Sequence, residues 1–219
     1  MAVTVWAAIL AVAACATPAS PPVAPATRPA VLVTAAPVWR PGDRWEYAWR
    51  SGAEAATRSI EVLEIKEING LSYYLLRAGD LEHLWTPELG WAGSVRNQRI
   101  EARMTPPTPL FVWPLEPGRR WQHRGTYEDR SGRKPVRDSF LVVGVETVEV
   151  PAGRFQAFKV VRETDSRDSD QYWYAPEVGF YVKWAGRRGD VEFEEELRAY
   201  HRAPRLIPDS RPEVPSRTP

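Results

Sequence analysis

Short runs of β-branched and aromatic residues, separated by turn residues, fill residues 38–202 of this chain. In two long runs, residues 58–68 and 137–150, apolar and polar side chains alternate with a period near two, as a strand with one buried face requires. The intervening segments carry Asn, Gly, Pro and Asp, which are typical of tight turns. Apolar residues nowhere in this region recur with a sustained helical spacing. The pattern therefore predicts an all-β, antiparallel protein.

An internal repeat divides this region into two halves. Five segments of the first half have counterparts in the same order in the second, among them the turns TPELG at residues 86–90 and APEVG at residues 175–179. Pro suits the second position of both turns, and we expect Gly to take the left-handed position of a bulged hairpin. We predict two similar half-domains of five or six strands each, residues 38–104 and 119–202, joined by a Pro-rich crossing at residues 105–118. The pattern does not decide between a sandwich, a clam and an open barrel.

Composition limits the class of partner. The chain has 219 residues, 43% of them hydrophobic and ten of them Trp, which is enough apolar surface for one sizeable core. Its 29 basic and 28 acidic residues are spread along the chain and give a net charge of +1. No field of one sign is available to attract nucleic acid or an anionic membrane surface. We therefore expect no nucleic-acid partner.

The N-terminus carries an uncharged apolar segment, residues 2–14, that ends at the single cysteine of the chain, Cys15. This segment is too short to span a bilayer core of roughly 30 Å as a helix but has the length of a signal-peptide core. Residues 12–15, VAAC, resemble the lipobox of bacterial lipoproteins, and the resemblance implies that residues 1–14 are a signal peptide and that Cys15 is lipidated. A single Cys also excludes a disulfide within the chain. A soluble exported protein, cleaved at an A-x-A-like site, and an ordinary cytosolic N-terminus are the alternatives.

Extended or disordered segments are expected on both sides of the β region. Residues 15–37 are rich in Ala and Pro, which favours an extended, polyproline-like tether. Residues 203–219 combine several prolines with little periodicity, and we expect a disordered tail. The lipobox resemblance, with neutral Ala16 after the cysteine, implies a lipid anchor in the bacterial cell envelope, in the outer membrane and facing the periplasm. The membrane is thus the first expected partner.

Two motifs in the second half resemble a known family. Residues 150–155, VPAGRF, are followed by a β-branched run and then by YAPEVG at residues 174–179. This order resembles the TapB-like bacterial envelope lipoproteins, a family with a β-rich domain that is associated by name with type IV pilus assembly. The resemblance covers about residues 121–184 and implies an accessory role at the envelope, with an envelope protein as partner. It implies no catalytic residues for this chain.

The sequence shows no pattern typical of catalysis or metal binding. His83, His123 and His201 have no metal-ligand spacing, and a single His on a strand is usually a surface or interface residue. There is no G-x-S-x-G motif and no Gly-rich phosphate loop. An acidic run at residues 192–197 is typical of the solvated face of a last strand rather than of a calcium loop. We expect neither an enzyme nor a cofactor.

Aromatic residues are densest at residues 172–184, where Tyr172, Tyr174, Phe180 and Tyr181 make the second half richer than the first. Core packing is the ordinary role of such residues, but a curved sheet rich in aromatics can also hold a lipid chain or dock a protein. These four residues form our candidate partner or ligand surface. Two functions follow: an accessory lipoprotein that contacts envelope proteins, or a carrier or sensor of a lipid-like ligand between the halves. The carrier needs an apolar cavity of several hundred Å³, whereas a docking protein can be solid.

Overall fold

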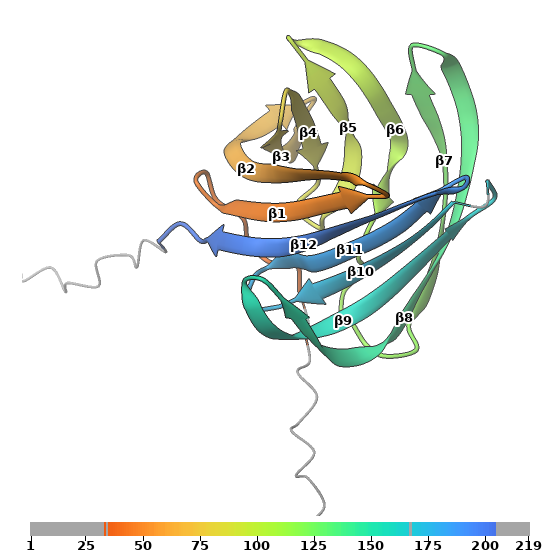
Figure 1. The fold of residues 1–219 in the computed structure, drawn as a ribbon. Coiled ribbons are helices and arrows are strands. Elements are labelled where there is room, and N and C mark those ends of the chain that lie inside the picture. The colour runs from red at the N-terminus through yellow and green to blue at the C-terminus, as the bar shows by residue number, and fades with distance from the viewer. Residues whose placement is uncertain (1–32, 34, 167, 205–219) are drawn as a thin grey trace, which may run out of the picture. The chain divides into compact units, whose positions relative to one another are not determined.

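The computed structural model describes residues 33, 35–166 and 168–204 of the chain. In this part, twelve antiparallel strands form one closed barrel in which each strand pairs with its neighbours in sequence and β1 pairs with β12 (Figure 1). The strands are β1 (Arg44–Ser51), β2 (Glu54–Ile68), β3 (Leu71–Ala78), β4 (Leu81–Trp85), β5 (Gly90–Arg96), β6 (Arg99–Pro109), β7 (Arg120–Asp129), β8 (Gly132–Val150), β9 (Gly153–Thr164), β10 (Ser169–Ala175), β11 (Phe180–Arg188) and β12 (Val191–His201). The prediction of an all-β, antiparallel protein is confirmed.

The two predicted halves do not form a sandwich, a clam or an open barrel, because backbone pairing joins them at both boundaries. β6 pairs with β7 over residues 102–105 and 126–129. β1 pairs with β12 over residues 44–50 and 194–201. The strands are therefore one continuous sheet closed on itself, rather than a sandwich, a clam or an open barrel. Among the described strands, closure leaves no unpaired edge, which would otherwise present backbone groups to other chains.

The Pro-rich crossing is shorter than expected. β6 continues through Pro109, so residues 105–109 belong to a strand. Residues 110–119 then link β6 to β7. This link contributes three buried side chains to the core, those of Leu110, Phe111 and Leu115. The backbone N–H of Leu115 also donates a hydrogen bond to the carbonyl of Val33 at 2.9 Å, so the chain that precedes β1 lies against the link.

An aromatic cluster of Trp39, Trp45 and Phe180, here called the aromatic plug, fills the end of the barrel where β1 begins. The Trp39 ring is fully buried, and its centroid lies 5.3 Å from that of Trp45 and 4.9 Å from that of Phe180. Trp39 Nε1 donates a hydrogen bond to the carbonyl of Gly179 at 2.9 Å, and Trp45 Nε1 donates to that of Val178 at 3.3 Å. Buried indoles usually bond through their N–H in this way. The plug therefore ties the segment before β1 to the turn between β10 and β11.

The two Pro-Glu turns differ in the residue that adopts the left-handed conformation. In residues 175–179 this residue is Gly179, with a φ of 71°. In residues 86–90 it is Leu89, with a φ of 65°, and Gly90 instead begins β5, so the expectation for Gly90 is wrong. The Leu89 side chain is fully buried. Its burial contributes about 1.5–3 kcal/mol, which offsets a left-handed backbone cost of about 1–2 kcal/mol.

Candidate functional site

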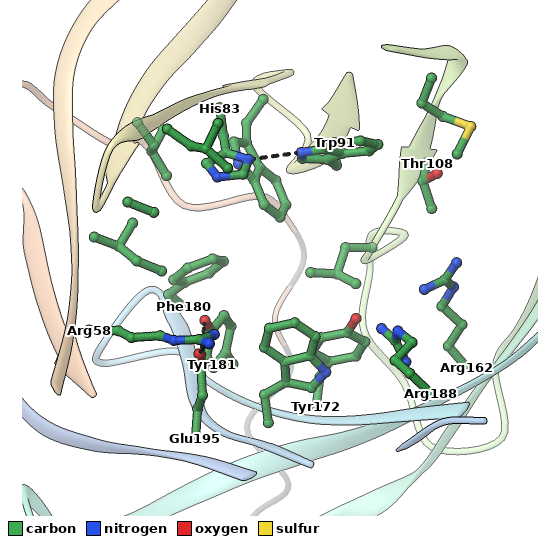
Figure 2. A pocket seen from close by; sticks show the side chains of 18 of the residues that line it. Arg58, His83, Trp91, Thr108, Arg162, Tyr172, Phe180, Tyr181, Arg188 and Glu195 are labelled. Carbon is green, nitrogen blue, oxygen red and sulfur yellow. Dashed lines mark hydrogen bonds and ion pairs between the residues drawn. The ribbon is translucent and has the colours of Figure 1, made fainter. Parts of the chain in front are cut away.

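A cavity of about 1020 Å³ lies inside the barrel (Figure 2). Every strand except β1 contributes lining residues, and most of the lining is apolar. At one end the cavity reaches Gly79 and Asp168, in the β3–β4 and β9–β10 connections. At the other end it reaches Trp85 and Phe180, beside the aromatic plug. The cavity therefore runs along the barrel and is closed off at the plugged end by aromatic rings.

Five aromatic residues, here called the aromatic floor, line the apolar part of the cavity: Trp85, Tyr172, Phe180, Tyr181 and Trp184. Phe180 meets Trp85 edge to face, with ring centroids 5.8 Å apart. Tyr172 stacks on Trp184 at 5.6 Å with an interplanar angle of 19°. Edge-to-face and stacked pairs of this kind hold each other in place and present wide apolar faces. The floor is thus a preformed apolar surface.

Three of the four predicted site residues line this cavity, namely Tyr172, Phe180 and Tyr181. The fourth, Tyr174, does not; its ring packs against that of Phe111, with centroids 5.0 Å apart. All four side chains are buried, with at most 6% of their surface exposed. Closure of the sheet turns them away from solvent, so they form no exposed docking surface. The structure instead brings three of them together in the wall of an internal cavity.

Glu195 of β12 is a buried carboxylate on the cavity wall. It accepts a hydrogen bond from the Tyr181 hydroxyl at 2.9 Å and forms an ion pair with Arg58 Nη1 at 2.8 Å. Burial raises the pKa of Glu195, against the opposing effects of Tyr181 and Arg58. The expectation that residues 192–197 face solvent is therefore wrong for Glu195. The apolar residue Leu197 could have predicted this, because it is buried and alternate residues of a strand share a face, so Glu195 faces the same way.

Two buried aspartates hold a pair of arginines at another part of the wall. One oxygen of Asp170 accepts a hydrogen bond from Arg162 Nη1 and the other accepts one from Arg188 Nη2, each at 2.8 Å. Asp138 accepts from Arg162 Nη2 at 3.0 Å, and both carboxylates have no exposed surface. Figure 2 shows Arg162 and Arg188 across the view from Arg58. Buried charges persist only when paired in this manner, so the aspartates fix both guanidinium groups in position.

His123 belongs to the same cluster, and the expectation of a surface or interface histidine is wrong for it, because its side chain is buried. Its Nδ1 lies 3.1 Å from Asp138 Oδ2, and its Nε2 lies 3.0 Å from the carbonyl oxygen of Pro106. Each ring nitrogen therefore faces an acceptor. Asp138 also accepts a hydrogen bond from Arg162, so this buried carboxylate lies between the His123 ring and the guanidinium. His123 therefore helps to hold Asp138 in the cluster.

His83 lines the cavity on β4 and is held by its neighbour on β5. Trp91 Nε1 donates a hydrogen bond to His83 Nδ1 at 3.2 Å, as the dashed line in Figure 2 shows. Burial lowers the pKa of His83, which keeps the ring neutral with its proton on Nε2. Within the described ranges, no three His, Cys, Asp or Glu side chains are grouped so that they could hold a metal ion. His83 therefore acts here as a polar element of a mainly apolar wall.

Two polar atoms on the cavity wall are buried but have no hydrogen-bond partner among the described residues: Thr108 Oγ1 and Arg162 Nε. An unpaired buried polar group costs about 1–3 kcal/mol, so native structures rarely retain one without a reason. The sequence does not predict that either atom is unpaired, because this depends on how the strands assemble into the barrel. Both residues line the cavity, so their side chains lie beside the space that a bound molecule would occupy.

Comparison with known proteins gives only distant likenesses. No family model and no curated protein matches the chain. One similar structure is a Bacteroides fragilis protein that is proposed to be exported and has a YmcC-like fold. It is 12% identical to this chain, with a TM-score of 0.44, and the match covers 78% of this chain and 100% of that protein. A proposed lipoprotein of Parabacteroides distasonis is 11% identical with a TM-score of 0.41, and the match covers 74% of this chain and 96% of that one. The hypothetical lipoprotein YmcC of Escherichia coli is 9% identical with a TM-score of 0.42, and the match covers 74% of this chain and 87% of that one. Such values assign neither a family nor a function, and the TapB-like resemblance stays a prediction.

The segments that predict the cellular location lie outside the described part of the chain. Cys15, the predicted signal peptide and most of the predicted tether precede the described residues, and residues 205–219 of the predicted tail follow them. The described residues contain no helix that is long and apolar enough to cross a membrane.

Proposed function

We propose that the barrel binds a lipid-like ligand in its cavity and acts as a carrier or sensor of that ligand rather than as an enzyme. The supporting observation is the cavity itself, with about 1020 Å³ of space and a mostly apolar lining. Protein interiors are otherwise packed at a density of about 0.75 and contain few voids larger than a water molecule. A large apolar void with a few convergent polar groups is typical of a small-molecule site.

We also propose that the protein is a lipoprotein of the bacterial envelope, anchored through Cys15 and facing the periplasm from the outer membrane. The VAAC motif at residues 12–15 supports this address. An accessory role with an envelope protein partner, including one in type IV pilus assembly, stays a prediction. That role does not need a cavity, so a binding experiment separates it from the carrier function.

The binding test uses the neutral, apolar fluorescent probe N-phenyl-1-naphthylamine, which brightens in apolar surroundings. The full chain is prepared as Cys15→Ser, so that no acyl group of its own competes for the cavity. We expect saturable binding of the probe. Met104→Trp adds bulk to the cavity wall and should weaken binding by about tenfold or more. The matched control is Val143→Trp, which adds the same side chain on the outer surface, where Val143 is 53% exposed.

The carrier function fails if the folded protein does not bind the probe or if the two Trp variants bind it equally well. Gentle detergent extraction of the native protein, followed by mass spectrometry of co-purifying lipids and proteins, gives an independent result. A stoichiometric lipid supports the carrier function. A stoichiometric protein with no lipid contradicts it and supports the accessory role.

The predicted anchor is tested by metabolic labelling with a radioactive or clickable fatty acid. We expect the wild type to be labelled and Cys15→Ser to remain unlabelled, because lipidation uses the thiol of the single cysteine. Membrane fractionation of the same two proteins should give the same contrast. Equal labelling of both proteins would refute the lipoprotein assignment.

A further inference from the structure

We propose that the ligand carries an oxyanion head group, a carboxylate or a phosphate, which Arg162 and Arg188 bind inside the barrel while its apolar chain lies on the aromatic floor. This inference rests on the proposed function and adds the chemical class of the ligand. It is a single amphiphile rather than a fully apolar molecule. The residues that would bind it lie in the wall formed by β9, β10 and β11.

The first observation is that the two arginines are preorganised. Both line the cavity, and each is anchored on a separate oxygen of the buried Asp170 carboxylate at 2.8 Å. Trp184 Nε1 also donates to Asp170 at 2.9 Å, which fixes that carboxylate against the floor. A guanidinium has five N–H donors in a rigid fork that matches carboxylate and phosphate oxygens. Two such groups held by a common partner form an anion site with little ordering entropy left to lose on binding.

The second observation is an unused donor. Arg162 directs Nη1 to Asp170 and Nη2 to Asp138, but its Nε is buried without a partner. Thr108, which is 6% exposed, adds a hydroxyl on the cavity wall that is likewise unpartnered. A side-chain rotation that turns either group toward the cavity would let a ligand oxygen accept its hydrogen bond and remove its desolvation cost. A purely apolar ligand offers no such acceptor.

The third observation is the local charge. Arg162 and Arg188 line the cavity, whereas Asp138 and Asp170, the two carboxylates that pair with them, are not among its lining residues. Lys134 and Asp168 also line the cavity on this side; their charges are opposite, so together they add no net charge. On the other side Arg58 and Glu195 form a closed pair. The charged side chains that face the cavity on this side are therefore mainly positive, which suits an anionic head group.

The neighbouring apolar surface completes the fit. Tyr172 and Trp184 lie in the same wall as Arg162 and Arg188, and burial raises the pKa of Tyr172, so its hydroxyl stays protonated and uncharged. A head group held by the arginines thus continues directly into the aromatic floor. This arrangement suits a molecule that is charged at one end and apolar along the rest of its length.

The test measures displacement of N-phenyl-1-naphthylamine by three twelve-carbon competitors that differ only in the head: dodecanoate, dodecyl phosphate and neutral dodecanol. In the parent protein, at least one of the two anions should bind about tenfold more tightly than dodecanol, because a charge-assisted hydrogen bond changes affinity by about this factor. The tighter of the two anions identifies the head as a carboxylate or a phosphate. Arg188→Gln should remove most of this preference and leave dodecanol binding unchanged.

Arg187→Gln is the matched control, because it removes the same charge one residue away on the exposed face of β11. Thr108→Val, of nearly equal shape, is a second variant and should weaken anion binding several-fold without affecting dodecanol. Equal binding of all three competitors, or an anion preference that survives Arg188→Gln, overturns the head-group assignment while leaving the carrier function intact. Failure of every competitor to displace the probe contradicts the carrier function itself.

Discussion

Trp39 and Phe180 meet edge to face at the end of the barrel, with ring centroids 4.9 Å apart and an interplanar angle of 81°. Trp39 lies before the first strand, whereas Phe180 begins β11 and lines the cavity. The contact makes the segment before β1 a structural part of the barrel, because it supports the aromatic floor from outside the cavity. The same ring therefore links the stability of the plug to the shape of the binding site.

Trp39→Ala should lower the free energy of unfolding by about 3–5 kcal/mol, as expected for truncating a large buried aromatic side chain. Urea unfolding followed by circular dichroism measures this change. Val38→Ala is the neighbouring control; Val38 is 60% exposed, and a change within about 0.5 kcal/mol is expected. If the two variants are equally stable, the plug does not close the barrel as described.

Gly93→Ala should destabilise the β5–β6 pair. A Cβ added at Gly93 would collide with the backbone carbonyl oxygen of Ala102 and lie 3.2 Å from Arg103 Cα, and backbone atoms cannot move aside cheaply. A loss of about 1–3 kcal/mol is expected in the same urea experiment. Gly144→Ala is the control, since a Cβ there meets nothing within 4 Å. Equal stability of the two variants would contradict the close approach of β5 and β6.

Asp170→Asn should be strongly destabilising, because it leaves Arg162 and Arg188 facing a neutral partner in a buried site. Removing one member of a buried ion pair typically costs about 3–5 kcal/mol. Asp190→Asn, in the exposed turn between β11 and β12, removes the same charge and should change stability little. Thermal unfolding of both variants provides the comparison. A similar melting temperature for the two would show that Asp170 does not organise the arginines.

Glu195→Gln should alter the pH dependence of stability. Burial raises the pKa of Glu195 above its ordinary value of 4.5, so the folded state binds a proton that the unfolded state has released. Wild-type stability should therefore fall relative to Glu195→Gln as the pH rises from 4.5 through the raised pKa, and the two should be similar below that window. Glu192→Gln, on the exposed part of the same strand, is the control. A constant difference across the window would contradict the prediction.

Local sequence patterns predicted the strands well because strand periodicity is a local property. The alternating run at residues 58–68 lies within β2, and that at residues 137–150 lies within β8. Barrel closure was not predictable in the same way, because it depends on pairing between β1 and β12, at opposite ends of the folded region. The left-handed Leu89 was also missed, since only its burial in the assembled core offsets the backbone cost.

The candidate site was predictable only in its apolar part. Dense aromatics at residues 172–184 pointed to Tyr172, Phe180 and Tyr181, which line the cavity. The polar part was missed, because Asp138 and Asp170 are far apart in sequence and meet through Arg162 only in the assembled sheet. Alternation along each strand says that such a residue faces inward, but not which charge it will meet there.

Because the first strand of the barrel pairs with the last, the ring cannot shut until β12 has been synthesised. Until then β1 and the newest strand both present open backbone edges, which are templates for association with other chains. Contacts between such distant segments also make folding slow, since the long intervening loop must be ordered before the closing pairs form. A chain that ends before residue 191 should therefore expose two open strand edges and aggregate more readily than the full chain.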